Sequence, residues 1–171
     1  MYSVGELILY SKTGVCRVDA LEEKALSPGE KTRPYYILHP LFQSGRIFVP
    51  VEHVENGTIF TRPIMRAEQA RAFIQTLPSL NAEPYYNQNL AQLKDYYRRQ
   101  MQAPSCQDLA LLLRSIYRKR QATVGKNRKL SVVDREFMED AENLLYGELA
   151  AALGIRREEV QAYIDAALSG R

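Results

Sequence analysis

The hydrophobic positions in the first sixty or so residues fall in short runs that are typical of β-strands. These runs are rich in β-branched and aromatic residues, and they occupy residues 4–10, 14–21, 34–39, 46–51 and 58–62. Turn-forming residues separate them, for example Ser27-Pro28-Gly29 and Asn56-Gly57. Five short strands in so short a segment fit a small, strongly curved barrel better than an open sheet. We therefore predict a β-barrel at the start of the chain.

After Pro63 the hydrophobic positions recur every three or four residues, which is the period of an α-helix. One apolar stripe covers residues 70–77, and a second covers residues 86–101. The sequence PSLNAEP at 78–84 lies between the two stripes and has the composition of a linker. The pattern thus predicts two helices joined by an irregular connection.

Three more helices are predicted in the last third of the chain. Ser105 and Ser131 each precede an acidic residue three positions later, which is the pattern of a capping box. A last helix is expected after Gly154, over about 156–169. The predicted fold class is α+β, with an N-terminal five-stranded barrel followed by a C-terminal all-α helical bundle. The predicted domains are residues 1–64 for the barrel, 65–83 for a connecting helix and linker, and 84–171 for the helical domain.

Positive charge is concentrated in the middle of the chain. Residues 81–130 carry ten Lys and Arg against three Asp and Glu, whereas residues 131–171 carry four against nine. The stretch SIYRKRQATVGKNRKLS at 115–131 contains six cations and no acid. Cations gathered on one edge of a bundle are suited to the phosphates of a nucleic acid. The alternative is a solvated basic face that the acidic residues of 136–148 neutralise.

Tyr85 and Tyr86 are expected to begin the helix that follows the linker. Neighbouring side chains on a helix point about 100° apart, so both rings cannot face the core. One ring is therefore expected to be exposed near the basic edge, where it could stack on a base at a distorted step of DNA. The alternative reading, in which either ring belongs to the core, stays open.

The sequence shows no arrangement of residues that is typical of an enzyme or a metal site. His39 and His53 are not in a ligand-spaced pair with a cysteine, and no glycine-rich phosphate loop follows a strand. We expect a non-enzymatic protein without a cofactor or a metal. Cys16 and Cys106 are too few for a secreted disulfide scaffold, and no apolar run approaches the ~18 residues of a membrane span. The expected location is the cytoplasm, without a membrane partner.

Several segments, taken in their order and spacing, resemble one known family. They are VGELILYSKTGVCRVDALEE (4–23), YYILHPL (35–41), VPV (49–51), TRPI (61–64), LSVVDREFM (130–138) and NLLYGELAAALG (143–154). The chain resembles the CarD/CdnL family of bacterial transcription regulators over almost its whole length.

This resemblance implies an SH3/Tudor-like RNA-polymerase-interacting barrel followed by a helical DNA-binding domain. Members of the family dock on the β subunit of bacterial RNA polymerase by pairing an edge strand with it. They also contact promoter DNA near the upstream edge of the bubble and modulate the stability of the open complex. The implied polymerase-binding residues are Lys24, Arg46, Ile47, Phe48 and Val49. Together with the charge pattern, the resemblance predicts DNA contacts, mostly to phosphates of the duplex, for Tyr85, Tyr86, Asn89, Arg114, Arg118, Lys119, Arg120, Lys126, Arg128, Lys129 and Arg135.

The chain departs from the family pattern at the start of the predicted DNA-binding domain. It has no tryptophan, and Tyr86 stands where many members have a tryptophan that acts as a minor-groove wedge. Asn89 stands where an arginine usually follows. The segment 121–131 is longer than the usual connection and brings extra cations. We therefore expect part of the DNA contact to have moved from the helix start to this loop.

A function of a different class remains as an alternative. In that reading the protein is an adaptor whose barrel binds another partner and whose basic loop binds an acidic protein. Under either hypothesis the protein is expected to be a monomer.

Overall fold

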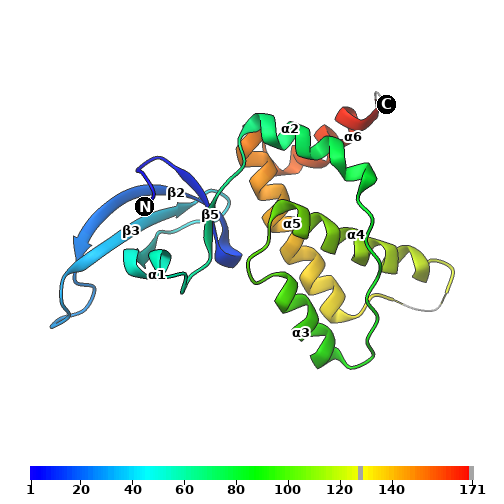
Figure 1. Cartoon of the computed structure of the whole chain (residues 1–171), viewed down its shortest axis with the longest axis horizontal. Coiled ribbons are helices and arrows are strands. Elements are labelled where there is room, and N and C mark those ends of the chain that lie inside the picture. Colours follow the sequence, from blue (N-terminus) through cyan, green and yellow to red (C-terminus); the bar gives the residue numbers. More distant parts are fainter. Residues whose placement is uncertain (127–128, 170–171) are drawn as a thin grey trace. The chain divides into compact units, whose positions relative to one another are not determined.

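The computed structural model describes residues 1–126 and 129–169, and residue contacts divide the chain into two units, Met1–Met65 and Arg66–Arg171. The first unit contains the strands and the second contains most of the helices (Figure 1). The predicted α+β class, with a five-stranded β-domain followed by helices, is confirmed.

The first unit is built on one antiparallel sheet. Its strands are β1 (Leu7–Tyr10), β2 (Gly14–Lys24), β3 (Arg33–Pro40), β4 (Ile47–Pro50) and β5 (Thr61–Pro63), with a 3₁₀ turn, η1 (Ser11–Thr13), between β1 and β2. The hydrogen-bonded order is β4-β3-β2-β1-β5. The order ends at β4 and β5, so the pairings among the described residues give a five-stranded sheet, and closure into the expected barrel is not part of them.

Burial alternates over only part of the sheet: in β2 exposed Arg17 lies between buried Cys16 and Val18, whereas in β3 the four residues 35–38 are all buried. The buried core contains Ile8, Cys16, Val18, Tyr36, Leu38, Val49 and Val51. Cys16 is fully buried in this core, and burial raises the pKa of its thiol to about 11. It therefore packs as a small hydrophobic residue, as expected from its place in a strand.

A short helix, α1 (Val51–Glu55), follows β4 directly. This helix was not predicted, because residue 51 was expected to end a strand over 46–51; the observed strand is two residues shorter, one at each end. Pro50 cannot donate to a sheet, and it stands at the N-cap of α1, where a missing N–H costs nothing. Val51 is turned into the core by this change of direction.

The second unit is a helical bundle. Its elements are α2 (Ala67–Thr76), η2 (Leu77–Ser79), α3 (Leu90–Gln100), α4 (Cys106–Thr123), α5 (Val132–Leu153), η3 (Arg157–Glu159) and α6 (Val160–Ser169). The long helix α5 contacts α2, α3, α4 and α6, so it is the central element of the bundle (Figure 1). The helix α2 thus belongs with the second unit, where it packs on α5 and α6.

The predicted helix ends are confirmed where a capping residue was identified. Ser105 and Ser131 are the N-caps of α4 and α5, and in each case a capping box forms with the aspartate three residues later. Gly154 ends α5 with a φ of 68°, in the left-handed region that favours glycine. The predicted helix start at Tyr85 and Tyr86 is wrong. The helix α3 starts at Leu90, because Asn89 caps it by accepting from the backbone N–H groups of Ala91 and Gln92.

Candidate functional site

The strand β4 lies at an edge of the sheet. Within the described residues it is hydrogen-bonded to β3 alone, in a register that pairs Tyr35 with Pro50 and Leu38 with Ile47. Its other side presents unpaired backbone groups, which can accept a strand from a partner. The edge predicted for residues 46–49 is therefore present, whereas its occupant stays a prediction.

The side chains of this strand divide between the core and the surface. Val49 is buried, and Ile47 packs against the core from a partly buried position. Phe48 is 39% exposed, and Arg46, just before the strand, is also exposed. Since Ile47 and Val49 point inward, only their backbone is available to a partner. Arg46 and Phe48 supply the side chains at this edge.

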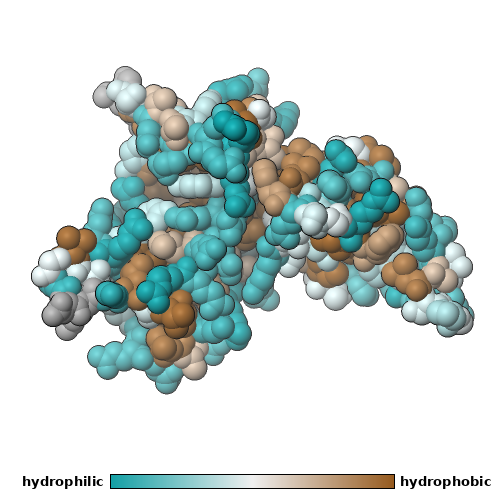
Figure 2. All heavy atoms as spheres, turned by 180° about the vertical axis from the view of Figure 1, so that it is seen from behind, coloured by the Kyte–Doolittle hydropathy of each residue, from teal (hydrophilic) through white to brown (hydrophobic). Residues whose placement is uncertain are grey.

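Lys24 lies next to Phe48, although the two residues belong to strands that are not neighbours in the sheet. Lys24 ends β2, and its ammonium lies 5.1 Å from the centroid of the Phe48 ring. The same ammonium lies 2.9 Å from a carboxylate oxygen of Glu22. Two of the residues predicted to bind polymerase thus lie together. Figure 2 shows hydrophobic side chains dispersed among hydrophilic ones on the face of the protein that is visible there.

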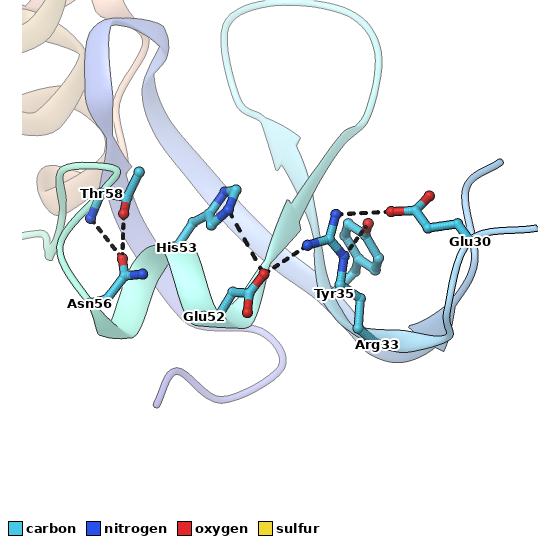
Figure 3. Close-up of polar contacts among 7 residues, drawn as sticks. All are labelled: Glu30, Arg33, Tyr35, Glu52, His53, Asn56 and Thr58. Carbon is cyan, nitrogen blue, oxygen red and sulfur yellow. Dashed lines mark hydrogen bonds and ion pairs between the residues drawn. The ribbon is translucent and has the colours of Figure 1, made fainter.

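A hydrogen-bonded cluster around Arg33 holds this end of the unit together (Figure 3). The Arg33 guanidinium lies 2.7 Å from Glu52 in α1 and 2.9 Å from Glu30, and its Nε donates to the Tyr35 hydroxyl. Asn56 accepts from the backbone and the hydroxyl of Thr58 in the turn after α1. The cluster links the start of β3 to the helix that follows β4, so both strands at this edge are anchored. The sequence did not predict the contact with Glu52, because Glu52 lies 19 residues from Arg33 and belongs to the helix that was not expected.

In the second unit, the two predicted tyrosines lie in the irregular segment before α3. The Tyr85 ring stacks on Tyr96 of α3, with centroids 3.9 Å apart. Tyr86 is 63% exposed. The expectation that one of the two rings is exposed is confirmed. Asn89, between this segment and α3, uses its side-chain oxygen to cap the helix.

The first two cations of the basic stretch hold this segment in place. The Arg118 guanidinium donates to the backbone oxygen of Ala82 at 2.9 Å and lies 3.3 Å from a carboxylate oxygen of Glu83. Lys119 lies under the aromatic segment, with its ammonium 5.2 Å from the centroid of the Tyr86 ring. Both side chains come from α4, so α4 helps to fix the path of the chain into α3.

Lys119 is buried, which corrects the expectation that it faces solvent as a phosphate-binding cation. Lys119 is only 5% exposed, and its ammonium lies 2.6 Å from Oδ1 of Asp134. Asp134 is itself only 3% exposed. The Tyr97 hydroxyl donates to the same oxygen at 2.7 Å. The Ser131 hydroxyl donates to the other carboxylate oxygen. A buried charge requires such a partner, because an unpaired one is strongly destabilising.

The charge state of Asp134 follows from these contacts. Burial alone would raise the pKa of its carboxyl, but hydrogen bonds from Lys119, Tyr97 and Ser131 together outweigh burial and hold the pKa below its usual value. Burial, and then the bond to the Asp134 carboxylate, raise the pKa of Tyr97. The three groups therefore form an ionised lysine–aspartate pair with a neutral tyrosine.

The other predicted cations are more accessible. Arg120, Lys126, Lys129 and Arg135 are exposed and Arg114 is partly exposed. Arg120 lies 5.0 Å from the centroid of the Tyr117 ring. No ion pair with a described carboxylate is found for Arg114, Arg120, Lys126, Lys129 or Arg135. Arg128 lies outside the described residues. Arg118 and Lys119 are paired within the unit, so they do not count among the cations available to DNA. The basic edge, defined here as the five described cations without an ion pair, is thus smaller than predicted.

Neither a metal centre nor a membrane segment is indicated by the part of the chain that the structure describes. No group of three His, Cys, Asp or Glu side chains in that part is placed to hold a metal ion. None of the helices described is long and apolar enough to cross a membrane.

Family models match the two units one after the other. The CarD-like/TRCF RID domain matches residues 2–64, and the CarD C-terminal domain matches residues 81–165. A comparison with curated proteins found no match. The two domains define an RNA-polymerase-interacting transcription regulator. The chain belongs to the CarD family, whose members are generally non-enzymatic, and the resemblance read from the sequence is confirmed.

Proposed function

We propose that this protein docks on the β subunit of bacterial RNA polymerase through the free edge of β4, and that its helical unit contacts promoter DNA near the upstream edge of the bubble. The contact modulates the stability of the open complex, and the protein acts as a cytoplasmic monomer without enzymatic activity. The observation that carries the proposal is the exposed edge strand in a domain of the polymerase-interacting family. Its direct test is replacement of the two exposed side chains at this edge, Arg46 and Phe48.

Docking through a strand edge uses backbone hydrogen bonds for affinity and the flanking side chains for selectivity. Arg46 and Phe48 are the exposed side chains at this edge, and Lys24 lies over the Phe48 ring. Ile47 and Val49 contribute through their backbone, since their side chains face the core. An aromatic ring and an arginine are the side chains that most often dominate the energy of protein interfaces.

The helical unit contacts DNA through cations that the protein itself leaves unneutralised. Arg114, Arg120, Lys126, Lys129 and Arg135 are described and accessible, and Arg128 belongs to the same stretch of sequence. None of the five described cations needs to be released from an ion pair before it meets a phosphate. Joined to a polymerase-docking unit, such contacts need little affinity of their own, because docking raises the local concentration of DNA.

Binding to duplex DNA is expected to depend steeply on salt. About four to six phosphate contacts give a slope of roughly −4 to −5 in a plot of log affinity against log salt concentration. The double substitution Lys126→Gln/Lys129→Gln should make the slope shallower by about 2, because two contacts are lost. Fluorescence titrations of a labelled duplex at several salt concentrations measure the slope.

The matched control for this experiment is Lys12→Gln/Lys31→Gln, which removes two exposed lysines from the other unit. These changes should leave the slope as it is in the wild-type protein. A response to salt that is flat in the wild-type protein, or equal in the two double variants, would contradict the assignment of DNA contact to the basic edge.

Tyr86→Ala is expected to slow formation of the open complex more than it weakens binding to an intact duplex. The exposed ring offers a flat apolar face to an unstacked base, and stacking of this kind contributes about 1–3 kcal/mol per base. Stopped-flow kinetics of promoter opening and duplex titrations give the two quantities. Tyr86→Phe is the control, since it keeps the ring and removes only the hydroxyl. An equal loss in both assays would contradict a role at the distorted step.

A further inference from the structure

Lys119 contacts the interior and the surface of the helical unit at the same time. On one side its ammonium is paired with Asp134 and lies 3.4 Å from the Tyr97 hydroxyl. On the other side it lies over the ring of Tyr86, which is largely exposed. The charge of Lys119 is therefore shielded from solvent by an aromatic ring that is itself at the surface. A cation in this position attracts the face of the ring.

The backbone around Tyr86 does not fix the ring by itself. The residue precedes the first turn of α3, so no helical hydrogen bond holds it. Neighbouring residues are held from other elements: Tyr85 stacks on Tyr96, and Arg118 donates to the carbonyl of Ala82. The Tyr86 ring itself is contacted by Lys119. The orientation of this ring thus depends on helix α4, although the residue is more than thirty positions away in the sequence.

We propose that Lys119 is a positioning residue, which uses its paired ammonium to hold the Tyr86 ring in a fixed orientation toward solvent, rather than a residue that binds phosphate. The proposal rests on the proposed function for the identity of the ligand that the ring meets, a distorted or unpaired base step of DNA. A ring that is already ordered does not lose rotational freedom when it binds, so more of its contact energy appears as affinity. The Asp134 carboxylate holds the Lys119 ammonium in place, and the two opposite charges neutralise each other.

A first experiment tests the positioning role without DNA. The chain contains no tryptophan, so Tyr86→Trp introduces a single fluorescent reporter at the ring in question. The reporter is compared in the wild-type background and in Lys119→Met/Asp134→Asn, which removes both buried charges together. In the Lys119→Met/Asp134→Asn background, the population with the ring held in place should fall relative to the population with a freely rotating ring. The expected decrease in this ratio is about two- to fivefold, which corresponds to the energy of a partly exposed cation–π contact. Lower fluorescence anisotropy and stronger acrylamide quenching report this loss.

A control separates this effect from general loosening of the unit. Phe137 is buried and packs on Tyr97, with ring centroids 5.3 Å apart, but it does not carry charge. In Phe137→Leu the core is weakened while Lys119 and Asp134 remain, so the anisotropy of the reporter should stay near that of the wild-type background. If Phe137→Leu lowers the anisotropy as much as the loss of the ion pair, or if neither changes it, Lys119 does not position the ring.

A second experiment links the positioning to DNA. Affinities are measured for an intact duplex and for the same duplex with a mismatched segment, using proteins with Tyr86. Lys119→Met/Asp134→Asn should reduce the preference for the mismatched duplex by about two- to fivefold and leave the salt dependence unchanged. Added to Tyr86→Ala it should have no further effect on the preference, because both act through one ring. A phosphate contact would instead make the salt slope shallower by about 1 on both duplexes, and that outcome overturns the proposal.

The two experiments distinguish failure of the inference from failure of the proposed function. A wild-type protein that binds neither duplex contradicts DNA contact by the helical unit, whereas the anisotropy still decides whether Lys119 holds the ring. Anisotropy that does not respond to loss of the ion pair contradicts the positioning role, whatever the affinity for DNA.

Discussion

Arg46→Ala/Phe48→Ala is expected to abolish binding to the β subunit of RNA polymerase while the melting temperature stays close to that of the wild-type protein. The substitutions remove the two exposed side chains that flank the free edge of β4 and the ring that lies against Lys24. Loss of two such side chains at the centre of an interface weakens binding by about a hundredfold or more. Exposed substitutions usually change stability by only about 0.5 kcal/mol. Pull-down of the isolated β subunit and thermal unfolding measure the two effects.

Leu21→Ala provides a matched control for the polymerase test. Leu21 is 42% exposed, close to the exposure of Phe48, and it also lies in the sheet. It pairs in register with Tyr36, whereas Phe48 pairs with Ile37, so the two side chains point to opposite faces. Binding should survive in Leu21→Ala. Retention of the β subunit by the Arg46→Ala/Phe48→Ala variant would falsify the assignment of docking to this edge.

Lys119→Met is expected to destabilise the helical unit by about 3–5 kcal/mol, because it leaves the Asp134 carboxylate buried without its cation. A loss of this size lowers the melting temperature of a unit of this length by more than about 10 °C. Thermal unfolding followed by helical circular dichroism measures it. The control is Arg118→Gln at the neighbouring position, where the ion-pair partner Glu83 is 84% exposed at its side chain, and the loss should stay below about 1 kcal/mol.

The pH dependence of stability gives a second test of how much the Lys119–Asp134 ion pair stabilises the helical unit. The folded-state pKa of Asp134 is lowered, so its contribution is fully present above the unfolded pKa of about 3.9 and is lost as the pH falls through the folded-state pKa. Acidification should therefore reduce the difference in stability between the wild-type protein and Lys119→Met. A difference that stays constant down to strongly acidic pH would show that the carboxylate is not the source of the loss.

The fold was predictable from sequence wherever one local signal dominates. Runs of β-branched and aromatic residues bounded by turn residues predicted the strands, and the serine–aspartate pairs at Ser105 and Ser131 predicted the starts of two helices. The start of α3 was misplaced, because Tyr86 lies four residues before Leu90 and continues the apolar period by coincidence. Asn89 carries the competing signal, since asparagine is a preferred N-cap. The single turn of α1 is too short to show a helical period at all.

The candidate site was less predictable, because charge along a sequence does not show which cations are already paired. Lys119 follows Ile116 by three residues and so continues the buried stripe of α4, a signal that could have placed it inside. Its partner Asp134 belongs to the next helix, and only the packing of α4 on α5 brings the two together. The contact of Lys24 with Phe48 likewise joins β2 and β4, which are not neighbours in the sheet. Residue types were identified from sequence, but their neighbours required the tertiary structure.

The short length of β4 has a consequence for how firmly this regulator can hold its target. The strand offers four residues, is preceded by the charge of Arg46, and ends at Pro50, which lacks a backbone donor. Such an edge supports only a few hydrogen bonds, and the charge and the proline discourage two copies of the chain from pairing with each other. The attachment is therefore expected to be brief and reversible, so that the protein can leave once the polymerase moves away from the promoter.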